Sequence, residues 1–284
     1  MPYTLTAENQ AGERLTLTEY RSAYQVTYTG LGPVNADVIT SSLGLADGEK
    51  YNSARVGRRN VVLTVTINGN VEENRIRLYR WFTPKQWVKL YYKNGSRDVY
   101  TEGAVETFEV NQFTMVQQVQ ISIICPQPHL IGAEEIVKDI SGITDMFSFP
   151  FAIEAAGVPF SDLSGSEYAI LHNSGDEATG FIISVYARAA VTAPVIYNAV
   201  TNEAFRVRGT LESGHTLTID TRTGSKRLTI TSPSGEVVNA LYRKQAGSVW
   251  LQLQPGDNYI AYSAEADAAA MLVTLRHNDL YVGV

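Results

Sequence analysis

The single cysteine, Cys125, and the nearby His129 are the two residues whose types could form a nucleophilic pair. Such a pair needs a stabilised thiolate with a histidine within reach. Cys125 instead ends the alternating run VQISIIC, and Pro126 and Pro128 follow it. Prolines cannot donate the backbone hydrogen bonds that continue a sheet, and a cysteine beside isoleucines is usually a small buried side chain. We therefore expect no catalytic role for Cys125 and expect CPQP to close a domain.

Other kinds of catalytic or metal site have equally little support. The four histidines are widely spaced: His129, His172, His215 and His277. None falls in a zinc-binding spacing, and the chain has no phosphate-binding glycine loop and no nucleophile elbow. Asp220 and Asp257 are interpreted as a strand-edge residue and a turn residue. We predict no catalytic residue, no cofactor and no metal ion, and hence a protein that is not an enzyme.

Length and composition indicate two folded domains. The chain has 284 residues, of which 44% are hydrophobic and 18% charged, and it contains 16 tyrosines. This composition excludes a disordered chain, and no stretch reaches the roughly 20 apolar residues of a membrane span. The sequence MPYTLTAENQ lacks the features of a signal peptide, and one cysteine cannot form an intrachain disulfide. We expect synthesis in a cytoplasm and no membrane insertion.

Positive charge is concentrated in residues 50–97. This stretch has eleven basic and two acidic residues, a net charge of +9, although the whole chain carries −6. The aromatic residues among these cations are Trp81, Trp87, Tyr91 and Tyr92. Such a block could bind nucleic acid, or it could form a surface that contacts a neighbouring subunit. Because residues 87–92 alternate as in a strand, half of the aromatic side chains must face a core, and we favour the subunit surface.

The segment NGNVEENRIRLYRWFTPK predicts the one helix of the chain. Asn70 is a suitable N-cap with Glu73 completing a capping box, and Pro84 ends the helix after about Thr83. The expected apolar face comprises Ile76, Tyr79 and Phe82. The expected opposite face comprises Arg77, Arg80 and Trp81.

Elsewhere the pattern alternates as in β-strands. The runs YTLTAE, ERLTLTE, AYQVTYTG and NVVLTVTI predict an N-terminal β-sandwich, to which Asn94-Gly95 adds a hairpin. After an irregular stretch, strands return from EYAILHN to AAMLVTLRH, with turns at intervals typical of a second sandwich. We predict a mainly β protein with an N-terminal domain (1–133), a linker strap (134–148) and a C-terminal β-sandwich (149–284).

The order of these pieces resembles the distal tail protein family of siphophages and related prophages. The resemblance rests on YNSARVGRRNVVLTVTINGN, on the LYRWF helix, on G-x-V-E at Gly103–Glu106 and on the closing CPQP. In the second half it rests on HNSGDEATGFIISVYA, LTIDTRTGSKRL, VWLQLQPGDNYIAY and YVGV. It covers nearly the whole chain.

This resemblance implies a virion structural protein at the tail tip. Family members form a hexameric ring between the tail tube and the baseplate hub or tail-associated protein, through which DNA and the tape-measure protein pass. Their C-terminal domains are galectin-like sandwiches that offer docking sites for receptor-binding or accessory proteins. Under this hypothesis the residues expected at subunit or tube contacts are Arg58, Arg59, Arg75, Arg77, Arg80 and Trp81.

A second function class remains open, namely a carbohydrate-binding adhesion module of a phage or phage-like particle. Its exposed aromatic side chains would be Tyr242, Trp250 and Tyr259, which can stack on sugar rings. However, the segment Leu171–Ser174 lacks the Pro-Arg that completes the sugar-binding strand of galectins, which argues against binding in the galectin manner.

Overall fold

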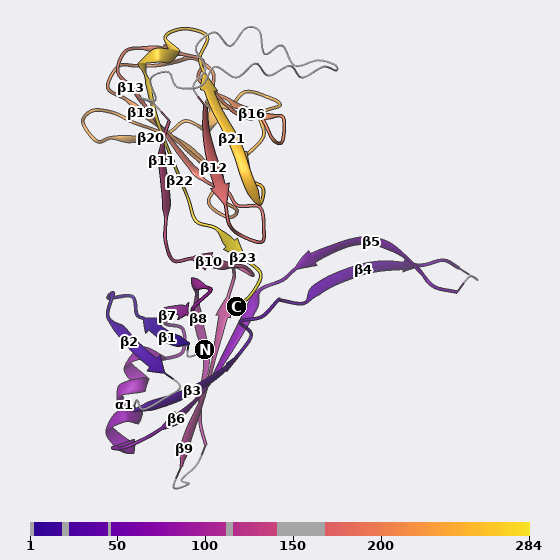
Figure 1. Ribbon diagram of the computed structural model, residues 1–284, viewed down its shortest axis with the longest axis vertical. Coiled ribbons are helices and arrows are strands. Elements are labelled where there is room, and N and C mark those ends of the chain that lie inside the picture. Colours follow the sequence, from indigo (N-terminus) through magenta and orange to yellow (C-terminus); the bar gives the residue numbers. More distant parts are fainter. Residues whose placement is uncertain (1–2, 19–22, 45–46, 112–115, 141–167) are drawn as a thin grey trace. The chain divides into compact units, whose positions relative to one another are not determined.

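The chain forms two compact units (Figure 1). The computed structural model describes residues 3–18, 23–44, 47–111, 116–140 and 168–284. The first unit comprises Met1–Glu134 together with Leu280–Val284, and the second comprises Glu135–Asp279. Of the expected linker 134–148, residues 141–148 lie outside the described part. Residues 136–139 form a strand of the second unit, and 280–284 belong to the first unit.

A nine-stranded antiparallel sheet is the framework of the first unit. The path β2-β1-β7-β8-β9-β6-β3 is extended at β8 by β10, which also pairs with β23. The strands are β1 (Thr4–Glu8), β2 (Arg14–Thr18), β3 (Tyr24–Thr29), β6 (Arg59–Ile67), β7 (Trp87–Lys93), β8 (Asp98–Val110), β9 (Gln117–Cys125), β10 (Leu130–Gly132) and β23 (Leu280–Tyr281). The end strands β2 and β3 lie beside each other, so the sheet curls around its core. Alternate residues such as Leu63 and Val65 are fully buried in that core, as the period of two predicts.

The hairpin predicted at Asn94-Gly95 is present, with a longer loop than two residues. Strands β7 and β8 pair up to Lys93 opposite Asp98, so residues 94–97 form the connection. The side-chain oxygen of Asn94 accepts hydrogen bonds from the backbone N–H groups of Ser96 and Arg97, at 2.8 and 2.7 Å. Asn94 therefore organises the turn through its own side chain.

Helix α1 (Val71–Trp81) is present, but the prediction of its faces was wrong except for Phe82, which is fully buried. Ile76 and Tyr79 are 45% and 41% exposed, whereas Leu78 and Trp81 are buried. Leu78, Trp81 and Phe82 form an alternative apolar stripe, and this stripe packs into the core. The capping box is also absent, because the Asn70 side chain donates to the Glu73 carboxylate (2.8 Å) and makes no cap bond to the backbone.

Strands β4 (Ala36–Ser42) and β5 (Glu49–Val56) form a separate two-stranded sheet of the first unit. They pair antiparallel with a bulge after Ile39. Figure 1 shows the hairpin as two long strands labelled β4 and β5. Every residue of both strands is exposed to solvent.

The second unit contains two main sheets around one core. Its strands are β11 (Ile136–Asp139), β12 (Tyr168–Asn173), β13 (Ile182–Ala187), β14 (Val191–Thr192), β15 (Val195–Asn198), β16 (Glu203–Arg206), β17 (Thr210–Leu211), β18 (Thr216–Asp220), β19 (Arg227–Thr231), β20 (Val237–Asn239), β21 (Gly256–Ser263) and β22 (Met271–His277). Single turns of 3₁₀-helix occur at η2 (Leu241–Arg243) and η3 (Ala268–Ala270).

One six-stranded sheet has the order β11-β22-β13-β18-β19-β20, and one four-stranded sheet has the order β12-β21-β15-β16. Strands β14 and β17 form a small third pair. Ile183 and Val185 of the first sheet and Ile196 and Ile260 of the second belong to the same buried cluster. The prediction of a mainly β protein with one α-helix is confirmed for the described residues.

Candidate functional site: assembly surfaces and a buried polar network

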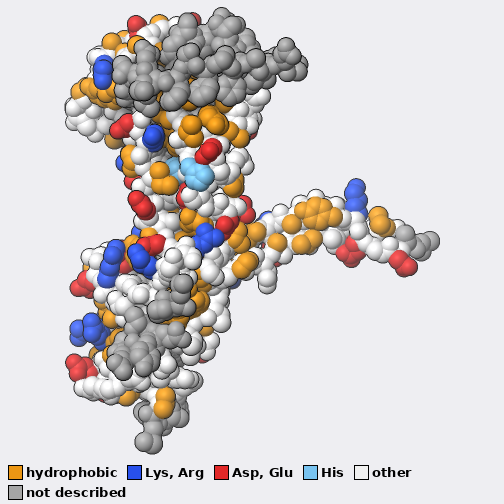
Figure 2. All heavy atoms as spheres, viewed as in Figure 1, with side chains coloured by type: hydrophobic (Ala, Val, Ile, Leu, Met, Phe, Trp, Pro, Cys, Tyr) orange, Lys and Arg blue, Asp and Glu red, His pale blue; other side chains and the backbone are white. Residues whose placement is uncertain are grey.

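The β4–β5 hairpin carries a run of exposed apolar side chains. Those more than 40% exposed are Val38, Ile39, Leu43, Tyr51 and Val56. Figure 2 shows hydrophobic side chains along the hairpin, with few charges among them. Its polar contacts are mostly cross-strand pairs, such as Arg55 Nε with Asp37 Oδ2 at 3.6 Å.

This surface is unusual for a hairpin in water. An isolated two-stranded sheet is marginally stable at best, because neither face is covered by a core. Contiguous exposed apolar patches mark interaction sites in soluble proteins. The hairpin is therefore a candidate binding element of the first unit. Sequence reasoning missed it, although the apolar residues on both sides of Leu45-Ala46-Asp47-Gly48 were a usable signal.

Helix α1 presents a second candidate surface. Arg77 and Arg80 are exposed, and Ile76 and Tyr79 lie on the same solvent-facing side. The ring of Tyr79 contacts Phe108 of β8 edge-on, with centroids 5.0 Å apart, and this contact fixes one edge of the surface. An arginine and aromatic surface of this kind is typical of protein interfaces.

The six residues predicted for interfaces have different environments. Arg58, Arg77 and Arg80 are exposed, and the side chain of Arg75 is 17% exposed and paired with Glu72. Trp81 is buried in the core, which corrects the prediction that it lies on the outward face with Arg77 and Arg80. Arg59 is 1% exposed, so its guanidinium does not reach the surface of the unit.

Arg59 is held by backbone carbonyls. Its Nε donates to Pro128 O at 2.8 Å, Nη1 donates to Gly30 O and Gly32 O at 2.6 and 2.7 Å, and Nη2 donates to Val282 O at 2.9 Å. Among the described residues no carboxylate lies within ion-pair distance of it. Burial lowers the pKa of Arg59, and four of its five N–H groups are satisfied.

Cys125 is a buried core side chain, as the sequence predicts. It is fully buried, and burial raises the pKa of its thiol. Its Sγ lies 3.9 Å from the carbonyl oxygen of Ile123. A neutral, inaccessible thiol cannot act as a nucleophile.

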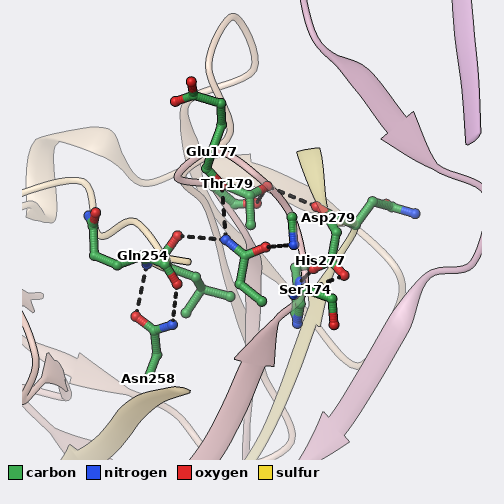
Figure 3. Close-up of polar contacts among 12 residues, drawn as sticks. Ser174, Glu177, Thr179, Gln254, Asn258, His277 and Asp279 are labelled. Carbon is green, nitrogen blue, oxygen red and sulfur yellow. Dashed lines mark hydrogen bonds and ion pairs between the residues drawn. The ribbon is translucent and has the colours of Figure 1, made fainter. Parts of the chain in front are cut away.

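The second unit contains a buried network of polar side chains that joins its loops (Figure 3). Asn173 donates to the carbonyls of Glu177 and Leu253, at 3.0 and 3.1 Å. Asn258 donates to Gln254 O at 2.7 Å and accepts from Gln254 N at 2.9 Å. Both side chains are essentially fully buried, and each makes bonds that loop backbones would otherwise lack. We interpret the network as structural.

His277 and Asp279 lie at one side of this network. They are 1% and 6% exposed, and His277 Nδ1 lies 3.4 Å from Asp279 Oδ1. The other carboxylate oxygen of Asp279 accepts from Ser174 N at 3.2 Å, and Thr179 donates to Asn278 O at 2.9 Å. Burial lowers the pKa of His277, and the charge of Asp279 partly opposes that shift.

The two aspartates considered in the sequence differ in environment. Asp220, interpreted as a strand-edge residue, is the last residue of β18. It is fully buried and accepts from Arg222 Nε and Nη2 at 2.9 and 2.8 Å. Asp257 is exposed and pairs with His172 Nδ1 at 2.6 Å. They lie in different sheets, and the structure does not bring them together as an acid pair.

The aromatic residues proposed for sugar binding are also dispersed. Tyr242 of η2 is 76% exposed, whereas Trp250 packs against Phe205 with ring centroids 5.0 Å apart. Tyr259 of β21 is 38% exposed and lies opposite Ile170 of β12. Among the described residues, no group of three metal-binding side chains is present, and no helix is long and apolar enough to cross a bilayer.

Comparisons with known proteins match both units. Residues 10–125 match the family described as phage tail protein RIFT-related domain, and residues 174–281 match the siphovirus-type tail component, C-terminal domain. No curated protein matches the chain significantly.

Among solved structures, the Dit protein (gp 19.1) of phage SPP1 is similar with a TM-score of 0.66 and 14% identity, over 98% of each chain. That protein is described as a paradigm of the hub adsorption apparatus in phages that infect Gram-positive bacteria. A chain of the phage P2 baseplate in its activated conformation with Ca is similar with a TM-score of 0.54 and 11% identity, over 98% of each chain. The same baseplate with Sr gives a TM-score of 0.52 and 12% identity, over 98% of this chain and 97% of that one.

Both halves of the chain thus match tail components, and the fold matches the SPP1 Dit protein over 98% of the chain. The chain belongs to the siphophage distal tail protein family and is a structural component of the phage tail and baseplate.

Proposed function

We propose that this protein assembles as a hexameric ring that joins the tail tube to the baseplate hub or tail-associated protein. Its first unit forms the ring, and DNA and the tape-measure protein pass through the lumen. Its second unit offers docking sites for receptor-binding or accessory proteins. The protein performs no catalysis in this role.

The observation that carries the proposal is the exposed β4–β5 hairpin. Val38, Ile39 and Tyr51 are 51–62% exposed on a two-stranded sheet that has no core of its own. A ring built by rotation needs a heterologous contact, in which one patch of a subunit meets a different patch of its neighbour. The hairpin supplies one such patch, and the α1 surface with Arg77 and Arg80 supplies a candidate for a second.

Substitution of Val38 by Asp tests this contact. A charge placed at the centre of an apolar interface is costly, so we expect the particle to shift from a hexamer toward single chains. Mass measured by light scattering or native mass spectrometry gives the oligomeric state, and electron microscopy shows whether a ring is present.

The matched control is Val237→Asp in the second unit, because Val237 is also a strand valine and is 62% exposed. It should leave the particle intact. A wild-type protein that stays single, both alone and when the tail tube and hub proteins are supplied, would contradict the ring.

Carbohydrate binding is the second candidate. The observation that favours it is the exposed face of strands β12 and β21, where Tyr168, Ile170 and Tyr259 lie beside the His172–Asp257 pair. Aromatic faces next to hydrogen-bonding groups can hold sugar rings. A glycan array decides the question: a saccharide signal that Tyr259→Ala removes would support this function, and a silent array would exclude it.

A further inference from the structure

We propose that Leu280–Val284 is a clasp that completes the first unit, so that this unit reaches its stable, assembly-competent form only after the segment has returned to it. In the sequence, the whole second unit (residues 135–279) lies between this segment and the rest of the first unit. The part of this proposal that concerns assembly rests on the proposed ring. The part that concerns folding of the first unit does not.

Backbone pairing places the segment within the first unit. Strand β23 pairs antiparallel with β10, with Leu130 opposite Tyr281 and Ile131 opposite Leu280. Strand β10 pairs in turn with β8, so β23 of the clasp is one of the nine strands of the sheet and pairs at its β10 end. Further on, Val284 N donates to Leu31 O at 3.1 Å. The segment is therefore bonded at both of its ends.

Arg59 connects the clasp to two other loops. Its guanidinium is buried, and the carbonyls of Gly30, Gly32, Pro128 and Val282 all accept from it. A buried cation without a carboxylate is stable only when its donors are satisfied. Loss of the clasp removes the Val282 carbonyl from Nη2 and opens the others to water, so the cost of burying Arg59 is no longer offset.

Side-chain and backbone packing fit the clasp closely. The guanidinium carbon of Arg97 lies 4.1 Å from the centre of the Tyr281 ring. A Cβ added to Gly283 would lie 3.1 Å from Gly32 Cα and 3.2 Å from Leu31 O, which is tighter than ordinary contact. The two backbones can approach this closely because position 283 is glycine, whereas a Cβ added to Gly32 would meet nothing within 4 Å.

The clasp is the last part of the first unit to be synthesised, and this order affects when the unit can fold completely. A nascent chain that has completed residues 1–134 still lacks the clasp until residues 135–279 have been made and the chain has crossed back. The first unit of an incomplete chain then contains an unsatisfied buried arginine and a loop at Gly30–Gly32 without its partner. Such chains are expected to be excluded from assembly, because the unit that would form the ring is not yet stable.

Hydrogen–deuterium exchange on the full chain tests the clasp directly. In an Arg59→Met variant we expect exchange in residues 28–34 and 128–132 to rise by about tenfold or more, because these loops open locally. Arg208→Met is the control, because it removes an exposed arginine of the second unit. Peptides from β13, β18 and β22 of the second unit should be unchanged in both. Equal exchange in the two variants would overturn the proposal.

A chain that stops after Asp279 provides the second test. It should show the same raised exchange, and the acetylated peptide Leu-Tyr-Val-Gly-Val should restore protection when added at high concentration. Full-length Gly283→Val carries the same test if the shortened chain is insoluble, because its added side chain prevents the close approach to Gly32. Unchanged exchange in Gly283→Val, or a shortened chain as protected as wild type, overturns the clasp.

The clasp and the ring fail separately. If the wild-type protein is a single chain but loses protection in Arg59→Met, the clasp holds and the ring is excluded. If the wild-type protein is a hexamer and the shortened chain forms the same hexamer with the same protection, the ring holds and the clasp is excluded.

Discussion

At the scale of single residues, Cys125 shows how burial removes reactivity. Its side chain is fully buried opposite Arg59 in the β6–β9 pair, and burial raises the pKa of its thiol. We predict that Cys125→Ser lowers the free energy of unfolding by about 1–3 kcal/mol, because a hydroxyl loses its hydrogen bonds to water there. Urea unfolding of the purified protein measures this, and Cys125→Ala should cost less. A Ser variant as stable as wild type would show that the site admits water.

His277 makes the second unit sensitive to acid. Burial lowers the pKa of His277, so the folded unit binds fewer protons than the unfolded chain, whose imidazole titrates near pH 6.5. Stability is therefore complete above about pH 6.5 and falls as the pH falls through and below that value, until the folded-state pKa is passed. We predict that His277→Gln flattens the melting temperature between pH 7.5 and 5.5.

The control for that experiment is His172→Gln, because the His172 side chain is 62% exposed. It should keep the wild-type dependence of melting temperature on pH. A His277→Gln variant that retained the full loss of stability in acid would assign the effect to other groups.

Residue environments were predictable only where they depend on near neighbours in the chain. The burial of Cys125 follows from the alternation of its own strand. The burial of Arg59 does not, because its four partners come from residues 30, 32, 128 and 282 and no local pattern connects them. A double arginine at a strand start indicates a basic surface, and only the fold shows that one of the two is internal.

At the scale of elements, the motif Gly103–Glu106 lies within β8 and contacts the neighbouring strand β9. A Cβ on Gly103 would lie 2.2 Å from Ile124 O, so no other residue fits there without moving the sheet. The register shifts between Val105 and Thr107, which makes Glu106 a bulge residue whose carboxylate accepts from Ser122 Oγ at 3.0 Å.

We predict that Gly103→Ala destabilises the first unit by about 1–3 kcal/mol or more, because the added methyl overlaps the backbone of β9. Thermal unfolding measures the loss. Gly57→Ala is the matched control: nothing lies within 4 Å of its added Cβ, and its φ is not positive. Equal melting temperatures for the two variants would show that β8 and β9 separate without cost.

Substitutions in helix α1 can test whether this element takes part in the proposed ring. In the proposed assembly its exposed arginines meet a neighbouring subunit, so Arg77→Glu with Arg80→Glu should abolish the ring by placing like charges where opposite ones met. Light scattering measures the mass. The control, Arg188→Glu with Lys226→Glu, makes the same change in charge on exposed positions of the second unit. An intact hexamer in the α1 variant would remove this helix from the interface.

The elements themselves were largely predictable, because strands repeat with a period of two and turns are marked by Gly, Pro and Asn. The faces of α1 were not, since its apolar residues allow two stripes and only packing against β6 decides between them. The β4–β5 hairpin was missed because it has apolar residues on both faces, so it lacks the alternation by which the other strands were predicted.

At the scale of the whole molecule, the sequence predicted two units and their order but not the return of the chain to the first unit. The pairing of β23 with β10 joins residues about 150 positions apart, and such pairings leave no local period. The same limit applies to charge, because a run of cations in sequence need not form a surface of cations in space.

The basic stretch 50–97 illustrates that limit. Arg59 is buried. Four further cations have carboxylate partners within 4 Å: Arg55 with Asp37, Arg75 with Glu72, Lys89 with Glu102 and Lys93 with Asp98. Two of these acids, Asp98 and Glu102, follow the stretch directly on the paired strand β8, so the hairpin neutralises charges that appear unbalanced in the sequence.

We therefore predict weak binding to double-stranded DNA, which also suits the proposed ring, because DNA would have to pass through its lumen without being retained. Nonspecific affinity depends on the number of cations that can reach phosphates. Only five of the eleven are exposed without a carboxylate within 4 Å among the described residues, namely Lys50, Arg58, Arg77, Arg80 and Lys85. Fluorescence anisotropy with a labelled duplex should show no binding at micromolar protein and about 0.15 M salt. Tight binding with a steep dependence on salt would instead place these cations on a continuous nucleic-acid surface.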